Sequence, residues 1–358
     1  MISRSAISAV AAFLAVSCLA QSPSAIYDGG FNSTDATIGL RVGNGGAGQS
    51  GLVGLLANEF IKDSVKNGSA PFRVAWYTSD TTYSIEYLKT GLLDIGITYS
   101  PAAEEIAINQ GIVTDPAYYA FRDHFLFVGP AANPANISGG DDIMTIFSNL
   151  HSAAESGVTT DPSIKFLSRF DKSATNIKES LIWAGIGQVP WATAYSTGGE
   201  HVSGPAELLK HMSISSERVI ANSSDLQWYH QFIDFHIQAL TAAILLREYT
   251  ITDRGTILSL DAETANRTVI YKAGTDDASD PLLNPAHLLI GAKAPNPERA
   301  VAFAEWVISD RGQSVIAGFE KNGEKLYSAA PSSSSNSTRK RNLRLKMPSY
   351  TKLPITIY

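Results

Sequence analysis

Short apolar runs alternate with segments of helical periodicity along most of this chain. An α/β fold with a mainly parallel sheet is the arrangement that such alternation predicts. In the first third of the chain, strands are expected at residues 37–42, 72–78, 93–99 and 124–130, with helices at 52–63, 84–91 and 102–111.

The alternation restarts after Pro130. Helices are expected at 141–157, 173–185, 206–212, 226–249, 297–310 and 311–320, with strands at 164–169, 268–272 and 287–293. This order predicts two lobes with the chain crossing between them twice: lobe one from residues 36–125 plus 288–325, and lobe two from 126–287. Because ligands bind beyond the carboxyl ends of strands in open α/β sheets, the cleft between the lobes is the expected binding site.

The two ends of the chain differ from this body. Residues 1–20 have one early cation, Arg4, followed by an apolar run, as in a secretory signal peptide. The only cysteine, Cys18, lies inside it, so we expect neither disulfides nor thiol chemistry. Residues 326–358 contain a serine-rich linker and a basic end, which predict a disordered tail. No later apolar stretch reaches the ~20 residues of a membrane span, so the chain is expected to be secreted.

Composition adds two expectations. The chain has a net charge of −6 although its tail is basic, so the body is acidic and nucleic acid is not an expected partner. Glycosylation sequons, together with the signal peptide, favour a secreted, extracellular glycoprotein of eukaryotic origin. The six sequons begin at Asn32, Asn67, Asn136, Asn222, Asn266 and Asn336.

The sequence GNGGAGQSG, residues 43–51, lies between a predicted strand and a predicted helix. Glycines permit close approach of a ligand, and a helix start offers unpaired N–H groups, so this loop is a candidate anion site. We expect the backbone of Gly45 and Gly46, the amide of Asn44 and the hydroxyl of Ser50 to face the anion. The loop also fits the dinucleotide fingerprint, and it fits the phosphate-loop pattern except for Gln49 in place of lysine. A tight turn that needs glycine only for packing is the remaining interpretation.

A second candidate anion loop is SRFDKSAT, which follows the expected strand 164–169. Arg169 offers a planar set of donors for an oxyanion, and Ser173 and Thr175 offer hydroxyls at a helix start. The alternative interpretation is structural: Arg169 pairs with Asp171, and Ser173 caps the helix.

Several longer motifs resemble those of a known protein family. They are QSGLVGLLANEF, LKTGLLDIGITYSPAAEE, RDHFLFVGP, FLSRFDKSATNIKE, YTITDRGT, DPLLNP and AFAEWVISDRGQSVIAGF. Over residues 36–330 the chain resembles the tungstate-binding receptors of bacterial ABC importers, which are phosphate-binding-like, type II periplasmic binding proteins. Here the chain would be a secreted, eukaryotic (fungal-like) homologue.

The resemblance implies a two-lobed clamp that closes on a small oxyanion, tungstate or molybdate, without catalysis. By resemblance, Arg169 and Thr175 hold the anion from lobe two and Ser100 faces it from lobe one. It implies no cofactor and no metal cation, a monomer, and an ABC permease as partner only if the source is prokaryotic. Glycines stand where the family carries hydroxyl residues in the first loop, so phosphate, an organic phosphate or a carboxylate is the alternative ligand.

Enzyme classes fit the residues less well. A phosphate-loop NTPase needs the missing lysine. A dinucleotide enzyme needs an acid ~20 residues after the loop, whereas Asp80 lies further along. A secreted hydrolase could use Ser50 in the same cleft, but GQSGL lacks the second glycine of the nucleophile motif. His230 and His236 lack zinc-site spacing and are expected to be packing or surface residues of a long helix.

Overall fold

The computed structural model describes residues 21–192, 195–196 and 228–331. The predicted signal peptide, the helix expected at 206–212 and residues 332–358 of the tail lie outside the described residues, as do Asn222 and Asn336. The four other sequon asparagines, Asn32, Asn67, Asn136 and Asn266, are exposed. None of the helices in the described ranges is long and apolar enough to cross a membrane.

A mixed sheet forms the larger half of the molecule. Its strands, in spatial order, are β1 (Ala25–Tyr27), β3 (Arg73–Thr78), β2 (Ile38–Asn44), β4 (Ile95–Thr98), β11 (Leu283–Ile290) and β5 (Tyr118–Pro130). Only β2 pairs in parallel, with β3 and β4, whereas β1, β11 and β5 pair antiparallel with their neighbours. The prediction of a mainly parallel sheet is therefore wrong. Strand β11 comes after the second half of the molecule in the chain, and it runs antiparallel to both of its neighbours, β4 and β5.

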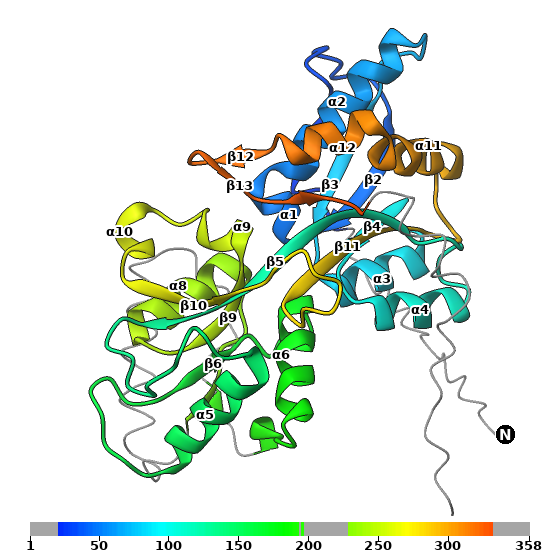
Figure 1. Ribbon diagram of the computed structural model, residues 1–358. Helices are drawn as coiled ribbons and strands as arrows, with labels where there is room; N and C mark the ends of the chain where they lie inside the picture. The colour runs from blue at the N-terminus through cyan, green and yellow to red at the C-terminus, as the bar shows by residue number, and fades with distance from the viewer. Residues whose placement is uncertain (1–20, 193–194, 197–227, 332–358) are drawn as a thin grey trace, which may run out of the picture.

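Strand β5 is shared by both halves, and Figure 1 shows it running from one to the other. Its first half pairs with β11 and its second half pairs with β9 (Thr250–Asp253) and β10 (Thr268–Ala273). A second, parallel sheet orders β6 (Phe166–Ser168), β8 (Tyr229–Gln231) and β7 (Tyr195–Ser196). Short pairings complete the strands: β12 (Glu320–Lys321) with β13 (Glu324–Lys325), and β14 (Ser328–Ala329) with β5.

Helices cover both faces of the larger sheet (Figure 1). Alternate residues of β3 show why, because side chains of a strand point to opposite faces. Val74 and Trp76 pack in one core with α2 (Leu52–Lys66), α11 (Pro297–Ile308) and α12 (Asp310–Ala317). Ala75 and Tyr77 pack on the other face, with α3 (Thr81–Thr90) and α4 (Pro101–Asn109).

The second half has its own aromatic core. Phe127 of β5, Phe147, Phe166 and Trp183 are fully buried there. The remaining helices are α1 (Gly46–Ser50), α5 (Ile143–Glu155), α6 (Ala174–Gly185), η1 (Pro190–Ala192), α8 (His236–Leu246), α9 (Arg254–Ile257) and α10 (Ala262–Ala265). One core draws on residues 40–121 with 286–327 and the other on residues 125–282, and these sets are called the first and second lobes below.

The structure corrects three sequence predictions. The long helix expected at 226–249 is divided into β8, a loop and α8, because residues 229–231 pair with the buried strand β6 and with β7. Part of the glycine loop is the short helix α1, which ends at Gly51 with a φ of 102°. The predicted linker begins too early, since Leu326 and Tyr327 are buried in the first lobe.

Close packing explains one glycine of this loop and predicts a difference between two alanine variants. A Cβ on Gly48 would overlap the indole ring of Trp76, whereas one on Gly46 would meet nothing nearer than His236 Nε2 at 3.9 Å. Gly48→Ala should lower the free energy of unfolding by about 1–3 kcal/mol, the usual cost of overpacking. Gly46→Ala should change it by less than ~1 kcal/mol. Urea denaturation of both variants measures this, and equal losses would show that the Trp76 contact is not what requires glycine.

Candidate anion site between the lobes

Arg169 is a buried cation with one unused donor. It follows β6 and is only 4 % exposed. Its Nε donates to the Asp234 carbonyl oxygen at 3.1 Å, and its Nη2 donates to the Asp171 carboxylate. Its Nη1 is enclosed and has no hydrogen-bond partner among the described residues. Because an unpaired buried donor on a charged group is costly, Nη1 is positioned for an acceptor on a ligand.

The loop that carries Arg169 is tightly constrained. Phe170 and Lys172 both have left-handed backbones, with φ of 44° and 64°. Ser168 Oγ accepts the Phe170 N–H at 3.1 Å, and Asn176 Oδ1 accepts the Lys172 N–H at 2.9 Å. These bonds offset the cost of the unusual backbone and fix the direction of the arginine.

Glu179 joins the elements beneath this loop. Its Oε1 accepts from Ser168 Oγ, from Asn176 Nδ2 at 2.9 Å and from the Tyr229 hydroxyl at 3.2 Å. Burial raises the pKa of Glu179 from 4.5 to about 8, so the carboxyl group is mostly protonated at neutral pH. Because Glu179 is neutral, it adds no negative charge under the loop to offset the positive charge of Arg169.

A small cavity is lined in part by Arg169. It has a volume of about 10 Å³, close to the space that one water molecule needs. Thr175 of α6, His236 of α8, and Thr252 and Asp253 of β9 also line it. The cavity therefore collects side chains from three elements of the second lobe.

His236 and Asp253 are less charged than their residue types suggest. Burial, and then the charge of Arg169, lower the pKa of His236 well below 6.5, so the ring is neutral. Its Nδ1 is enclosed and, within the described ranges, has no hydrogen-bond partner. Burial raises the pKa of Asp253, and this weakens its repulsion of an anion.

The first lobe meets this cavity through its glycine loop. A Cβ on Gly45 would lie 3.0 Å from His236 Cε1, and a Cβ on Gly46 would lie 3.9 Å from His236 Nε2. The lobes also touch where Thr82 Oγ1 donates to the Lys172 carbonyl oxygen at 2.8 Å. The lobes are thus in contact around the candidate site.

Of the eight residues predicted to bind the ligand, Arg169 and Thr175 line the cavity, and Gly45 and Gly46 lie near His236, which lines it too. Asn44 is instead used within its own lobe, because its Nδ2 donates to the Ile97 carbonyl at 3.0 Å and its Oδ1 accepts from Gly48 at 2.8 Å.

The other three residues predicted to bind the ligand are serines, and none of them lines the cavity. Ser50 Oγ bonds the Ala47 carbonyl at 3.1 Å and the Tyr327 hydroxyl at 2.9 Å. Ser173 caps α6 by accepting the Asn176 N–H at 3.3 Å. Ser100 is the N-cap residue of α4 and is not among the residues that line the cavity.

Sequence reasoning missed His236, Thr252 and Asp253. Thr252 and Asp253 stand at the carboxyl end of a strand inside the motif YTITDRGT, which was a usable signal. His236 was hidden because the apolar pattern of 226–249 favoured one continuous helix.

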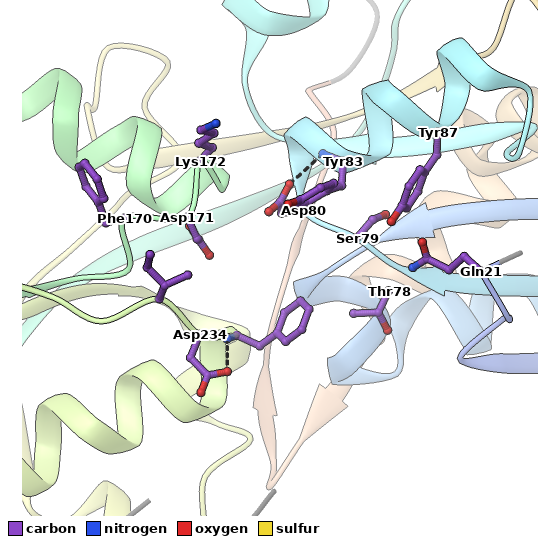
Figure 2. Close-up of a pocket in the computed structure, with 12 residues that line it drawn as sticks. Gln21, Thr78, Ser79, Asp80, Tyr83, Tyr87, Phe170, Asp171, Lys172 and Asp234 are labelled. Atoms are coloured by element: carbon purple, nitrogen blue, oxygen red, sulfur yellow. Dashed lines mark hydrogen bonds between the residues drawn. The ribbon is translucent and has the colours of Figure 1, made fainter. Parts of the chain in front are cut away.

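A larger cleft adjoins the cavity and is shown in Figure 2. It has a volume of about 500 Å³. Asp80 and Tyr83 of the first lobe face Phe170, Asp171 and Asp234 of the second across it. In the part of the chain that the structure describes, no three histidine, cysteine, aspartate or glutamate side chains are grouped so that they could hold a metal ion.

Comparisons with known proteins agree with this two-lobed arrangement. A family model described as a PBP superfamily domain matches residues 32–311. The chain belongs to the PBP superfamily. The predicted α/β, two-lobed binding-protein architecture is therefore confirmed.

Individual relatives within the PBP superfamily are more specific. The tungstate-binding protein TupA of Peptoclostridium acidaminophilum is 28 % identical over 284 residues, covering 78 % of this chain and 80 % of that protein. A "putative ABC transporter anion-binding protein" of Haloferax volcanii is 28 % identical over 259 residues, or 71 % of this chain. This chain spans 63 % of the length of that second relative.

A solved structure is more similar still. Described as a "periplasmic putative metal binding protein", it is 55 % identical, covers 86 % of this chain and 99 % of its own, and has a TM-score of 0.71. The predicted resemblance of this PBP superfamily chain to tungstate-binding proteins is confirmed by the sequence relatives.

Glu179 predicts a pH dependence of stability. Folding raises its pKa from 4.5 to about 8, so the native state holds a proton that the unfolded chain releases between these values. Its contribution to stability is complete below about pH 4.5 and is lost as the pH rises through about 8. Urea denaturation at pH 5 and pH 8 should therefore show a smaller loss of stability for Glu179→Gln than for the wild type.

The control for this prediction is Glu105→Gln, which changes an exposed glutamate of α4. It should keep the wild-type difference between pH 5 and pH 8. Parallel stability curves for Glu179→Gln and the wild type would contradict the assignment of a native proton to Glu179.

Proposed function

We propose that this protein is a secreted solute-binding protein that holds a small oxyanion, such as tungstate or molybdate, between its lobes without catalysis. The observation that carries the proposal is Arg169 Nη1, an enclosed cationic donor without a partner among the described residues; Arg169 lines a small cavity of the second lobe, and the glycine loop of the first lobe lies against His236 of the same cavity. The TupA relative supports tungstate as the first ligand to test. Phosphate is the alternative ligand.

Closure of the lobes provides the binding mechanism. The second lobe supplies Arg169, Thr175 and the neutral His236, and the first lobe supplies the backbone around Gly45 and Gly46. Since the inner cavity has room for about one water molecule, the lobes must separate for an oxyanion to enter. An anion that contacts both lobes stabilises the closed state by its higher affinity for that state.

The setting of this activity is part of the same proposal. The two lobes of this clamp are those defined by the two cores, with residues 40–121 and 286–327 in the first and residues 125–282 in the second. The protein acts as an extracellular monomer, glycosylated in a eukaryotic source and delivering its ligand to an ABC permease in a prokaryotic one. Sequons at exposed asparagines support glycosylation.

Replacing the arginine tests the site. Arg169→Gln should weaken tungstate binding by about 10- to 150-fold, because a hydrogen bond to a charged group contributes roughly 1.5–3 kcal/mol. Isothermal titration calorimetry with tungstate, molybdate, sulfate and phosphate measures the change, and circular dichroism checks that the variant is folded.

Lys172→Gln is the matched control, because it removes the same charge three residues away. In Figure 2 the ammonium group of Lys172 points away from Asp171 and Asp234. This control should bind tungstate within about threefold of the wild type, as expected for a screened charge. A folded Arg169→Gln variant with wild-type affinity would remove Arg169 from the site.

A further inference from the structure

We propose that the site, besides bare oxyanions, takes a small organic anion that also carries an ammonium group, with its anionic head beside Arg169 and its ammonium group in the cleft of Figure 2. The inference rests on the proposed function, since the head occupies the same anion site. It adds a second chemical class of ligand.

The space around Arg169 is divided in a way that suits such a ligand. Arg169 lines the inner cavity, whereas Asp171 and Asp234, which its Nη2 and Nε contact, line the outer cleft. The guanidinium group therefore lies between the two spaces. The outer cleft, at about 500 Å³, is within the usual range for small-molecule sites.

This volume persists although the lobes already touch. The Thr82–Lys172 hydrogen bond and the packing of Gly45 against His236 both cross from one lobe to the other. A bare tetrahedral oxyanion beside Arg169 would leave the outer cleft to water. A ligand with an organic body would fill it and contact both lobes over a larger area.

The charges of the cleft favour a cation there. Asp80, Asp171 and Asp234 line it together with Lys172, the one cationic side chain among the described residues of the lining, and Asp171 is also paired with Arg169. Burial, and to a smaller extent Asp171, raise the pKa of Asp80. An ammonium group beside Asp80 would relieve this repulsion, whereas a second anionic group would increase it.

Aromatic rings add a second source of cation recognition. Tyr83, Phe170 and Phe235 line the cleft, and Tyr83 is 57 % exposed. Ring faces attract ammonium groups, and attraction is stronger where water is partly excluded. Carboxylates and aromatic rings around one space are thus matched to an ammonium group on a short carbon chain.

Two phosphate esters form the decisive pair of probes. 2-Aminoethyl phosphate and n-propyl phosphate share the anionic head and nearly the same shape, and they differ by ammonium in place of methyl. Calorimetry on the full chain should show about tenfold tighter binding of the amine, from a charged hydrogen bond and ring contacts. Asp80→Asn should reduce this preference to less than about threefold with little change for propyl phosphate.

The variant is chosen so that folding is preserved. Asp80 caps α3 by accepting the Tyr83 N–H at 2.9 Å, and asparagine caps helices equally well. Asp142→Asn is the matched control: Asp142 caps α5, is exposed and is not among the residues that line the cleft. It should keep the full preference for the amine.

The outcomes separate this inference from the proposed function. Equal affinities for the two esters, or binding of bare oxyanions alone, would overturn the inference, while tungstate binding that depends on Arg169 would still support the proposed function. An amine preference that survives Asp80→Asn would also overturn it. Failure of every oxyanion and both esters to bind would overturn both.

Discussion

The candidate site depends on the guanidinium group of Arg169, which has hydrogen-bond partners on two of its nitrogens and none, among the described residues, on the third. Two of its nitrogens are held by Asp234 and Asp171, which fix its direction, and Nη1 is left enclosed at the cavity. The left-handed backbone at Phe170 and Lys172 and the neutral Glu179 below serve to hold this one side chain. A fully paired arginine would have been only a structural ion pair.

The long strand β5 makes this arrangement a clamp. It contributes to the sheet of the first lobe and to the β9–β10 pairing of the second, so the lobes share a backbone connection while each has its own core. The chain crosses again before β11. Two such connections permit hinge motion between rigid bodies and keep the glycine loop opposite His236.

Local patterns predicted the parts of this molecule that local forces determine. The strand–loop–helix units around Gly45 and Arg169 could be recognised from periodicity and from loop residue types. What sequence could not decide was the direction of each polar side chain. Asn44 and Ser50 turn inward and Ser173 caps a helix, because nearby backbone groups need partners. His236 was missed since the pairing of β8 with the buried strand β6 interrupts an otherwise helical pattern.

A crystal structure of the protein with tungstate, using the anomalous scattering of tungsten, tests the central claim most directly. The account predicts one strong anomalous peak beside Arg169, where the second-lobe cavity meets the glycine loop, with oxyanion oxygens within hydrogen-bond distance of Arg169 Nη1 and the Thr175 hydroxyl. A peak at another location, or none in crystals grown with saturating tungstate, would contradict it.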